Sequence, residues 1–505
     1  MASSLTKDSA SITGSEKTFF GHPRGLATLF MTEMWERFSY YGMRALLVYY
    51  LVSGGADAAT GAQGGGLAMR ATTATAIYSV YVSMVYLMAM PGGWFGDRVW
   101  GARKTVTIAG FVIMSGHLAL ALPGQAPFFA GLILVAVGSG LLKANISTMV
   151  GHLYEGPDDP RRDGGFTVFY MGINLGAFAA PLVIGTVGKE HNWHLGFALA
   201  ALGMALGLAQ FLLGTKNLSP KSSLVPNPLS AEERKGVLTK VAAVVAAIAV
   251  FYGVVVALGA YTLNWALVPL TLAGLIIPIA VLVRIKRDKD LSTTEQSKMN
   301  GYIWLFVAAA VFWMIYDQGG STLSLFADAK TTDNVGGIHF SATWYQSLNP
   351  LFVMALAPVF AWLWLWLARK NQEPNTIVKF AMGLVIIGAS FFVFIVPMNM
   401  AGDGKVSPMW LVSIYMIQTI GELCLSPVGL SVTTKMAPQK YASQMMGVWF
   451  LAVTAGDCFT GLLSLAGVSL DGLGIIAMEA SMAAVAGLAI YMYRKNVQAL
   501  MGGVH

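Results

Sequence analysis

Residues 32–51 read TEMWERFSYYGMRALLVYYL and combine the length of a membrane helix with four charged side chains. On a helix that turns by about 100° per residue, six of these residues fall on one face. They are Glu33, Glu36, Arg37, Tyr40, Tyr41 and Arg44. A charged side chain at the centre of a membrane helix costs about 2.5 to 3.5 kcal/mol on insertion scales, so these groups need partners. The stretch therefore predicts a membrane helix whose polar face points into a helix bundle, with Glu33 and Arg37 as a local ion pair.

Two interpretations of this polar face are open. In the first, the charges form a static ion-pair network that only holds helices together. In the second, the charges exchange partners while the protein works. Because six groups are aligned on a single face, the second interpretation is favoured over the first.

The rest of the chain has the composition of a membrane protein. Of its 505 residues, 56% are hydrophobic and 11% are charged, whereas soluble proteins carry about 25% charged residues. Apolar segments long enough to cross a bilayer recur along the chain, each crossing needing about 20 residues. This composition excludes a soluble globular protein. Cys424 and Cys458 lie in apolar segments and are expected to act as small hydrophobic residues rather than as a disulfide.

We expect an all-α polytopic membrane protein with fourteen spans, and an even number places both termini on one side. The expected limits are 26–52, 70–95, 104–122, 126–150, 165–188, 194–214, 237–258, 263–284, 300–326, 340–368, 377–397, 407–430, 443–466 and 472–493.

Lys and Arg residues are divided unevenly between the two sides that these spans define. Of the 32 in the chain, 25 fall on the side of the termini. The opposite side receives Arg70, Lys189, Lys330 and Lys405. Because cytoplasmic loops are rich in Lys and Arg, both termini are expected in the cytoplasm and the chain in the inner cell membrane. The net charge of +7 therefore indicates orientation and not a nucleic-acid partner.

Two polar stretches, 215–236 and 285–299, bracket the seventh and eighth spans and leave six spans on either side. Transporters built from two related bundles have this layout, with the substrate site near the midplane between the halves. The expected organisation is a cytoplasmic tail (1–23), a six-helix bundle (24–215), a linker with two extra membrane helices (216–299), a second six-helix bundle (300–495) and a cytoplasmic tail (496–505). Residues 1–23 contain no apolar segment, so the first span is expected to direct insertion.

Three motifs resemble those of one transporter family. Residues 33–42, EMWERFSYYG, resemble the ExxER(F)xYYG signature of the proton-dependent oligopeptide transporters, a branch of the major facilitator superfamily. Residues 169–176, FYMGINLG, resemble the fifth-helix FYxxINxG signature of that family. Residues 92–104, GGWFGDRVWGARK, resemble the loop between the second and third helices. The motif residues of this loop are Gly93, Asp97, Arg98, Gly101, Arg103 and Lys104.

The resemblance covers the chain from Gly21 to about Ala455 and implies a fold and a function. The implied fold is the major facilitator fold, and an inserted helix pair between its two bundles is typical of bacterial members. The implied function is proton-coupled symport of di- and tripeptides into the cell by alternating access. The charged loop residues either lock and release the bundles or serve only as positive-inside anchors, and both readings stay open.

A peptide cavity needs a cation for the carboxylate, an anion for the ammonium group and amide partners for the backbone. By resemblance, Arg44 and Lys143 form the positive end of the cavity. Glu422 is expected to accept the ammonium group, with Asn349 as its partner. The resemblance further implies a lining of Tyr40, Tyr41, Tyr78, Asn174, Trp313, Ser426 and Trp449. For Tyr78 and the two tryptophans, simple helix packing is the alternative.

Proton coupling requires a carboxylate whose protonation changes a salt bridge, because burial favours the neutral form and a nearby cation the charged form. Asp317, in FWMIYDQGG, is expected to pair with Arg44 across the bundles on the extracellular side. The family usually has Glu at this position, so the shorter Asp departs from its pattern. The two carboxylates of the first span are expected to exchange partners with Arg37 and Lys143.

Other titratable residues match no motif. The animal members carry a histidine directly after the second-helix tyrosine, but Ser79 occupies that position here. His117 is expected to be a hydrogen-bonded residue that packs between helices. Asp457 and Glu479 are expected to find partners in the bundle interior.

The sequence contains no HExxH, GxSxG, Walker A or paired metal-ligand spacing, so we expect neither an enzyme nor an ATP-driven pump, and no cofactor or metal. The buried charges do not form the single ring typical of a channel filter. The alternative functions are transport of nitrate or other organic anions and drug/proton exchange on the same fold. Glu422 favours a zwitterionic substrate, and drug exchange leaves the polar face of the first span unexplained. The expected partners are a peptide, protons and the lipid bilayer.

Overall fold

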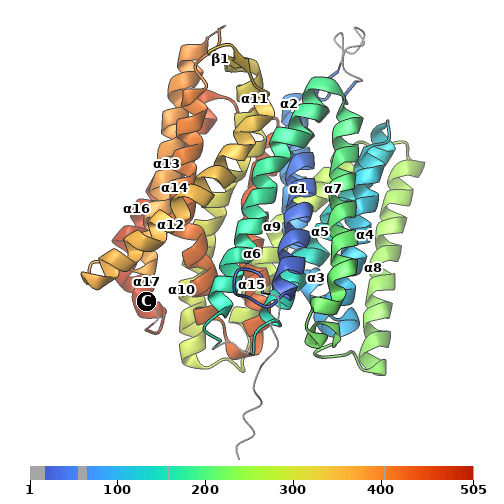
Figure 1. The fold of residues 1–505 in the computed structure, drawn as a ribbon, viewed down its shortest axis with the longest axis vertical. Helices are drawn as coiled ribbons and strands as arrows, with labels where there is room; N and C mark the ends of the chain where they lie inside the picture. Colours follow the sequence, from blue (N-terminus) through green and yellow to red (C-terminus); the bar gives the residue numbers. More distant parts are fainter. Residues whose placement is uncertain (1–17, 55–64, 156–158, 403, 504–505) are drawn as a thin grey trace, which may run out of the picture.

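The computed structural model describes residues 18–54, 65–155, 159–402 and 404–503, without the side chain of Ser443, and is almost wholly helical (Figure 1). Lys7 and Lys17 of the expected N-terminal tail lie outside the described residues. The first half contains α1 (Gly25–Val52), α2 (Ala71–Leu87), α3 (Ala89–Phe95), α4 (Ala102–Leu120), α5 (Gln125–Gly151), α6 (Arg162–Ala180) and α7 (Trp193–Gly214). The inserted pair is α8 (Ala231–Ala257) and α9 (Asn264–Lys286). The second half contains α10 (Thr293–Tyr316), α11 (Thr322–Lys330), the strands β1 (Asn334–Val335) and β2 (Ile338–His339), α12 (Leu348–Arg369), α13 (Thr376–Ala401), α14 (Met409–Met436), α15 (Ala442–Leu465), α16 (Leu473–Met492) and α17 (Arg494–Leu500).

Local sequence explains where several helices begin. Both α8 and α10 start with a capping box, in which a serine hydroxyl accepts from a glutamate N–H and the glutamate carboxylate accepts from the serine N–H. The pairs are Ser230 with Glu233 and Ser292 with Glu295. Gly101, with φ at 75°, separates the π-helical segment Gly96–Trp100 from α4. Since this backbone conformation disfavours residues with a Cβ atom, the glycine of the loop motif has a structural reason.

The helices before and after the inserted pair form two packed groups. In the first group, α1 packs against α6 and α7, and α4 against α5 and α7. In the second, α13 packs against α14 and α16, and α10 against α13 and α15. The two groups meet along α2 with α15 and along α6 with α12. Each of these two helix pairs takes one helix from each group, and the two pairs form the main part of the interface.

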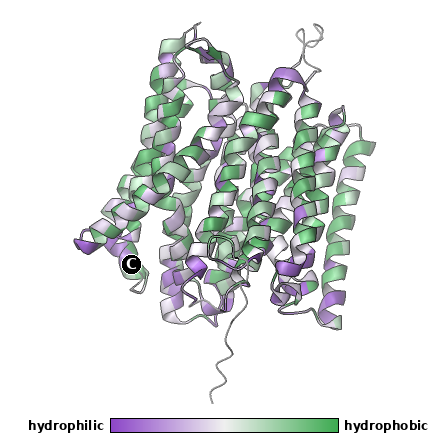
Figure 2. Cartoon of the chain, in the orientation of Figure 1, coloured by the Kyte–Doolittle hydropathy of each residue, from purple (hydrophilic) through white to green (hydrophobic). Residues whose placement is uncertain are grey.

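Twelve helical segments of the described chain are long and apolar enough to cross a membrane, judged by length and composition. The two remaining predicted spans are α1, which carries the four buried charges, and α4, which opens with Arg103 and Lys104. Each of the fourteen predicted ranges is thus occupied by helix. Apolar residues cover the lengths of the helices and polar residues gather at the two ends of the molecule (Figure 2).

The inserted helices differ in how they attach to the bundles. α9 packs against α15 and α2, whereas only 6% of the apolar window of α8 is buried. α8 lies at the edge of the molecule in Figure 1. Its contact with α9 includes the Tyr252 hydroxyl, which donates to the backbone oxygen of Trp265 at 2.9 Å. Most of the α8 surface is therefore left for lipid.

Polar contacts join the two halves at the end of the molecule that carries α11 and β1. Ser347 Oγ donates to the backbone oxygen of Phe178 at 2.7 Å, and Trp344 Nε1 donates to Thr186 Oγ1 at 2.7 Å. Thr343 Oγ1 donates to the backbone oxygen of Pro181 at 3.2 Å, and the Tyr49 hydroxyl donates to the backbone oxygen of Ser324 at 3.0 Å. Lys189 Nζ forms an ion pair with Asp328 Oδ1 at 2.6 Å. These contacts close the molecule at this end, which is the upper end in Figure 1.

Candidate site for substrate and protons

The charged face of α1 is buried, and its carboxylates share one guanidinium. Arg37 Nε lies 2.9 Å from Glu33 Oε1 and 2.6 Å from Glu36 Oε2. All three side chains are at most 4% exposed. Ser139 Oγ of α5 donates to Glu36 Oε1 at 3.1 Å. The expected Glu33–Arg37 pair is present, and Arg37 holds the second carboxylate as well.

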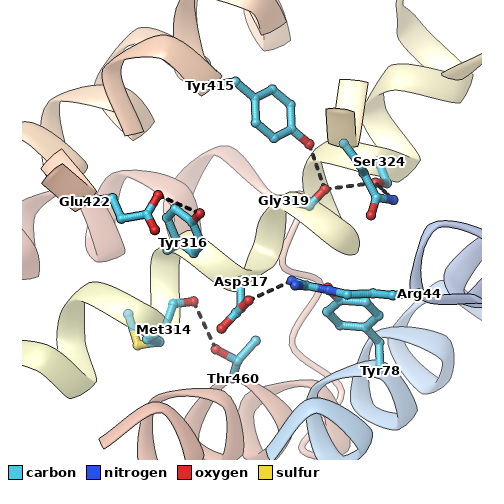
Figure 3. A network of polar contacts seen from close by, with 11 residues as sticks. Arg44, Tyr78, Met314, Tyr316, Asp317, Gly319, Ser324, Tyr415, Glu422 and Thr460 are labelled. Carbon is cyan, nitrogen blue, oxygen red and sulfur yellow. Dashed lines mark hydrogen bonds and ion pairs between the residues drawn. The ribbon is translucent and has the colours of Figure 1, made fainter. Parts of the chain in front are cut away.

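Arg44 joins the two halves of the molecule. Its Nη2 atom donates to Asp317 Oδ1 on the second half at 2.6 Å, and its Nε atom donates to the Tyr78 hydroxyl of α2 at 2.5 Å (Figure 3). Arg44 and Asp317 are 9% and 4% exposed. The structure thus contains the cross-bundle pair that the sequence predicts, and the shorter aspartate reaches the guanidinium.

The helix that carries Asp317 ends at this point. α10 stops at Tyr316, a 3₁₀ turn runs over Asp317–Gly320, and α11 follows. The backbone carbonyl of Gly319, which the helix break releases from the helical hydrogen-bond pattern, accepts from the hydroxyls of Tyr415 and Ser324, both at 2.8 Å (Figure 3). The predicted span at 300–326 lies within a single candidate membrane segment, Thr293–Lys330, and this turn interrupts its α-helix. The paired glycines after Asp317 break the helix, and the two hydroxyls satisfy a freed backbone group.

Tight packing explains the second of these glycines. A Cβ atom at Gly320 would overlap the Tyr78 hydroxyl. A glycine at position 320 therefore lets the turn Asp317–Gly320 lie against Tyr78 of α2. Arg44 contacts both Tyr78 and Asp317 at this point.

Glu422 on α14 lies in a set of neutral donors. Its Oε2 atom accepts from the Tyr316 hydroxyl at 2.8 Å and from Asn349 Nδ2 at 2.9 Å. Asn349 Nδ2 also reaches Thr419 Oγ1 at 3.0 Å. Asn349 is thus the predicted partner, whereas Tyr316 and Thr419 were missed by sequence reasoning. Tyr316, the last residue of α10, directly precedes Asp317, so two consecutive residues contact Glu422 and Arg44 (Figure 3).

Lys143 lies over two aromatic rings in this conformation. Its Nζ atom lies 3.7 Å from the ring centroid of Tyr86 and 4.9 Å from that of Phe450. Among the described residues it makes no ion pair with Glu33 or Glu36. A lysine can exchange a carboxylate for an aromatic face because the ring quadrupole attracts a cation. The two rings come from α2 and α15, so Lys143 also lies between the halves.

The tyrosines and amides of the predicted lining have mixed surroundings. Tyr40 is stacked with Tyr81, and Arg37 lies over its ring at 5.3 Å. The ring centroid of Tyr41 lies 5.8 Å from Arg44 Cζ. Asn174 is 6% exposed and donates to the backbone oxygen of Tyr170 in its own helix at 3.0 Å. Ser426 is half-buried on α14, one turn after Glu422.

The two predicted tryptophans lie in packed surroundings. Trp313 is 9% exposed and packs against Phe312 and Tyr316. Trp449 is 2% exposed, packs on Phe380, and fills the space above Gly429, where a Cβ atom would overlap the indole. Trp313 touches the Glu422 set through Tyr316. The surroundings of Trp449 favour helix packing over a cavity wall.

The charged loop residues contact the linker rather than the second half. Arg98 Nη2 lies 2.8 Å from Glu233 Oε1 at the start of α8. The backbone oxygen of Asp97 accepts from the N–H of Asn227 at 3.0 Å, and Arg103 Nη2 donates to the backbone oxygen of Ser219 at 3.4 Å. The two predicted readings were a lock between the bundles and positive-inside anchoring, and both stay open. The structure adds a third role, attachment of the inserted pair to the first half.

His117 and Glu479 are two of the titratable residues that lay outside the predicted motifs. His117 is buried, but neither ring nitrogen has a hydrogen-bond partner among the described residues, so the expected hydrogen bond is wrong. Close packing of α4 on α5 through Gly116 and Gly131 leaves apolar neighbours around it. Glu479 Oε2 accepts from Gln318 Nε2 at 2.9 Å.

A cavity of about 700 Å³ lies elsewhere. It is bounded by α12, the start of α13 and the face of α14 that carries Leu423, Pro427 and Ser431. None of the predicted site residues lines it. The charged groups described above, and not this cavity, therefore define the candidate site.

Two helical bundles that meet across buried, oppositely charged side chains define a class of protein: a multi-pass membrane transporter of the major facilitator fold, not an enzyme. A family model described as the POT family matches residues 103–467, and the chain belongs to this family. The family and the fold that the motifs predict are thus confirmed.

Similar proteins are known by sequence and by structure. A di-/tripeptide transporter of Lactococcus lactis subsp. cremoris is 40% identical over 498 residues, which cover 97% of this chain and 99% of the relative. The uncharacterized transporter YclF of Bacillus subtilis (strain 168) is 46% identical over 444 residues, 88% of this chain and 87% of the relative. A crystal structure of a peptide transporter POT in complex with sulfate is 45% identical with a TM-score of 0.91, covering 97% of this chain and 98% of that chain.

Proposed function

We propose that this chain carries di- and tripeptides into the cell together with protons, by alternating access between its two halves. The observation that carries the proposal is the stretch Tyr316–Asp317, where one residue bonds Glu422 and the next bonds Arg44. A carboxylate for an ammonium group and a cation for a carboxylate are thus linked through two adjacent residues. A short peptide offers both groups at a fixed separation.

The arrangement suits a zwitterion. Arg44 and Lys143 belong to the first half, whereas Glu422 and Asn349 belong to the second. A peptide that bridges these groups contacts both halves at once, so its binding energy favours conformations in which the halves approach each other. Glu422 is held by neutral donors only, and an ammonium group replaces the Tyr316 hydroxyl with a stronger, charge-assisted bond.

The Arg44–Asp317 pair supplies the coupling to protons. Protonation of Asp317 removes the charge that holds Arg44, because guanidinium itself keeps its proton at all physiological pH values. Arg44 is then free to bind the substrate carboxylate. Arg37 with Glu33 and Glu36 forms a second set in which Lys143 is available as an alternative partner.

Orientation follows from the distribution of basic residues. We place both termini and the basic loops in the cytoplasm of a cell whose inner membrane the chain crosses. The end closed by Ser347, Trp344 and Lys189 then faces outward, and the described conformation is closed to the outside. A proton entering from outside reaches Asp317 only after those contacts open.

The alternative of nitrate, organic anion or drug transport is not favoured. An anion carrier has no use for Glu422 and its two donors, and a drug exchanger does not need cations and a carboxylate at opposite ends of one site. The proposed substrate requires both groups.

Substrate class is tested by counterflow, with purified protein in liposomes loaded with unlabelled dialanine and labelled dialanine outside. We expect trialanine to compete, and free alanine, tetraalanine and nitrate to leave the exchange unchanged. Exchange that is inhibited by nitrate and not by trialanine would overturn the peptide assignment. Protein that is monodisperse by size exclusion and yet exchanges no peptide would overturn it as well.

A further inference from the structure

Asp457 on α15 is a buried carboxylate without a role in the site described so far. Its side chain is 2% exposed, and its Oδ2 atom has no hydrogen-bond partner among the described residues. An unpaired carboxylate oxygen in a protein interior is costly unless the group is neutralised by its surroundings. The position of Asp457 therefore needs a physical reason.

Its neighbours on α15 place Asp457 at the seam between α2 and α10. Three residues earlier, Thr454 Oγ1 donates to the backbone oxygen of Ser83 on α2 at 3.2 Å. Three residues later, Thr460 Oγ1 donates to the backbone oxygen of Met314 on α10 at 3.4 Å, beside the Arg44 pair (Figure 3). Residues three apart lie on the same side of a helix. The side chain of Asp457 thus faces the seam that contains Arg44.

Thr460, which lies on the same face of α15 as Asp457, is drawn beside Asp317 and Arg44 in Figure 3, so the face that carries Asp457 points toward this ion pair. Asp317 uses Oδ1 for its bond to Arg44, and its Oδ2 atom has no partner among the described residues. Asp317 and Asp457 are thus two buried carboxylates at one seam, each with an oxygen that lacks a hydrogen-bond partner among the described residues.

The charged side chains of α1, taken together with Lys143, Asp317 and Asp457, form a set in which carboxylates outnumber cations by one, and Glu422 is counted apart among its neutral donors. The carboxylates are Glu33, Glu36, Asp317 and Asp457, and the cations are Arg37, Arg44 and Lys143. A net charge is expensive in a low-dielectric interior, and two interacting carboxylates bind their first proton as a pair. One bound proton balances this set.

We infer that Asp457 acts through Asp317, increasing the affinity of the Arg44–Asp317 pair for the transported proton and so setting the pH at which the protein loads it. The inference rests on the proposed function. A nearby like charge favours the protonated form of a carboxylate, whereas a cation alone favours the ionised form. Without Asp457, Asp317 would be fully compensated by Arg44 and would take up a proton only at lower pH.

The other titratable groups near the seam have partners of their own. On α2 the Tyr78 hydroxyl accepts from Arg44, and on α14 Glu422 accepts from Tyr316 and Asn349. Lys143 of α5 lies over aromatic rings, and Cys458 on α15 faces Gly274. Arg284 and Lys286 lie in the last turn of α9, next to the loop that carries Asp288. Asp317 is thus the carboxylate through which Asp457 acts.

The test compares the pH dependence of uptake driven by a proton gradient in the parent, Asp457→Asn, Asp457→Glu and the neighbouring control Cys458→Ala. Dialanine counterflow at equal pH on both sides is measured in parallel as a readout of transport that needs no net proton movement. We expect the midpoint of driven uptake in Asp457→Asn to shift by about one pH unit or more to the acidic side. The Glu and Cys458 variants should keep the parent midpoint, and all four proteins should exchange dialanine.

An unchanged midpoint in Asp457→Asn, with or without a lower rate, would overturn the inference, since a purely structural role lowers rates at every pH. If Asp457→Asn does not fold, Asp457→Ser is the second variant, because serine is also neutral and polar but smaller. The same acidic shift is expected. A parent that exchanges dialanine but shows no driven uptake would instead contradict the proposed function itself.

Discussion

Arg44 is the residue on which the account depends most. It is buried, it donates to Asp317 across the halves, and it donates to Tyr78 within its own half. Guanidinium has several donors in a rigid fork and does not lose its charge, so only its partners can change. Asp317 is the partner that a proton can neutralise.

Replacing Asp317 by asparagine should separate exchange from coupling. The amide is nearly the same size and is permanently neutral, so Arg44 is released at every pH. We expect Asp317→Asn to retain dialanine counterflow to within a few-fold and to lose accumulation driven by a proton gradient. Both are measured in the same proteoliposomes.

Asp328→Asn is the matched control, because Asp328 also forms a cross-half ion pair, with Lys189, but outside the buried site. It should keep driven accumulation. Accumulation by Asp317→Asn that still follows the proton gradient would remove Asp317 from the coupling mechanism.

Glu422 makes a second residue-scale prediction, about recognition of the peptide amino group. Hydrogen bonds to a charged group contribute about 1.5 to 3 kcal/mol, which corresponds to roughly 10- to 150-fold in affinity. Glu422→Gln should weaken competition by dialanine by such a factor and should leave competition by N-acetyldialanine, which has no ammonium group, unchanged. Glu373→Gln, which changes a carboxylate beside Lys379, is the control. An equal loss for both ligands would show that Glu422 does not read the amino group.

Motifs predicted the charged residues of the site and the neutral residues Asn349 and Tyr78, but not Tyr316 or Thr419. Arg44, Asp317 and Glu422 stand out because a charge in an apolar helix is costly. Tyr316 and Thr419 carry no such signal, since tyrosine and threonine in membrane helices are common packing residues. The position of Lys143 over the rings of Tyr86 and Phe450 could not be predicted either, because it depends on the relative placement of α2, α5 and α15.

At the scale of elements, the break between α10 and α11 is the feature that hydropathy conceals. An apolar count runs through residues 300–326 without interruption, and only the pair Gly319 and Gly320 indicates the turn. Whether paired glycines break a membrane helix depends on partners for the freed carbonyl. Here the partners are Tyr415 and Ser324, one of them nearly a hundred residues away in sequence.

The inserted helices are fastened to both halves at the same end of the molecule. The start of α8 is held by Arg98 of the first half. The loop after α9 is held by Lys440 of the second half, whose Nζ atom lies 2.7 Å from both Asp288 and Asp290. The Tyr441 hydroxyl adds a bond to Asp288 at 2.5 Å. The pair α8–α9 therefore bridges two loops that belong to different halves.

This attachment should resist acid. Hydrogen bonds from Lys440 and Tyr441 lower the pKa of Asp288 well below its usual value. A carboxylate with a lowered pKa stabilises the folded state above its unfolded value of about 3.9, and this contribution is lost only as pH falls below that value. We expect Asp288→Asn to lower the Tm by the same amount at pH 7 and pH 5. Thermal unfolding in detergent measures both values, with Asp163→Asn, an exposed carboxylate on α6 outside this attachment, as the control. If the Tm difference between the parent and Asp288→Asn disappears at pH 5, Asp288 is protonated between pH 7 and pH 5 and the prediction is wrong.

At the scale of the whole molecule, the sequence was sufficient for the positions of the fourteen expected spans, each occupied by helix, and for the division into two groups around an inserted pair. Length and hydropathy decide these features, because a bilayer crossing has a fixed thickness. The sequence did not predict which end of the molecule is closed. That depends on polar contacts such as Ser347 with Phe178, whose residues belong to different halves and follow no periodic pattern.

The same limit applies to the tilt of α12. Its apolar character predicted a span, but only 6% of its apolar window is buried, and it leaves a cavity beside α14. Tilt is determined by packing against neighbours and not by hydropathy.

The central claim is that peptide and proton move together, and the most direct test measures the proton. Liposomes containing the purified protein and a pH-sensitive dye are held at equal pH with the membrane potential set inside negative. Addition of dialanine outside should acidify the interior, whereas free alanine and nitrate should not. Asp317→Asn should admit no protons on addition of dialanine. Dialanine entry without acidification, in protein that also exchanges dialanine, would contradict proton-coupled transport by this chain.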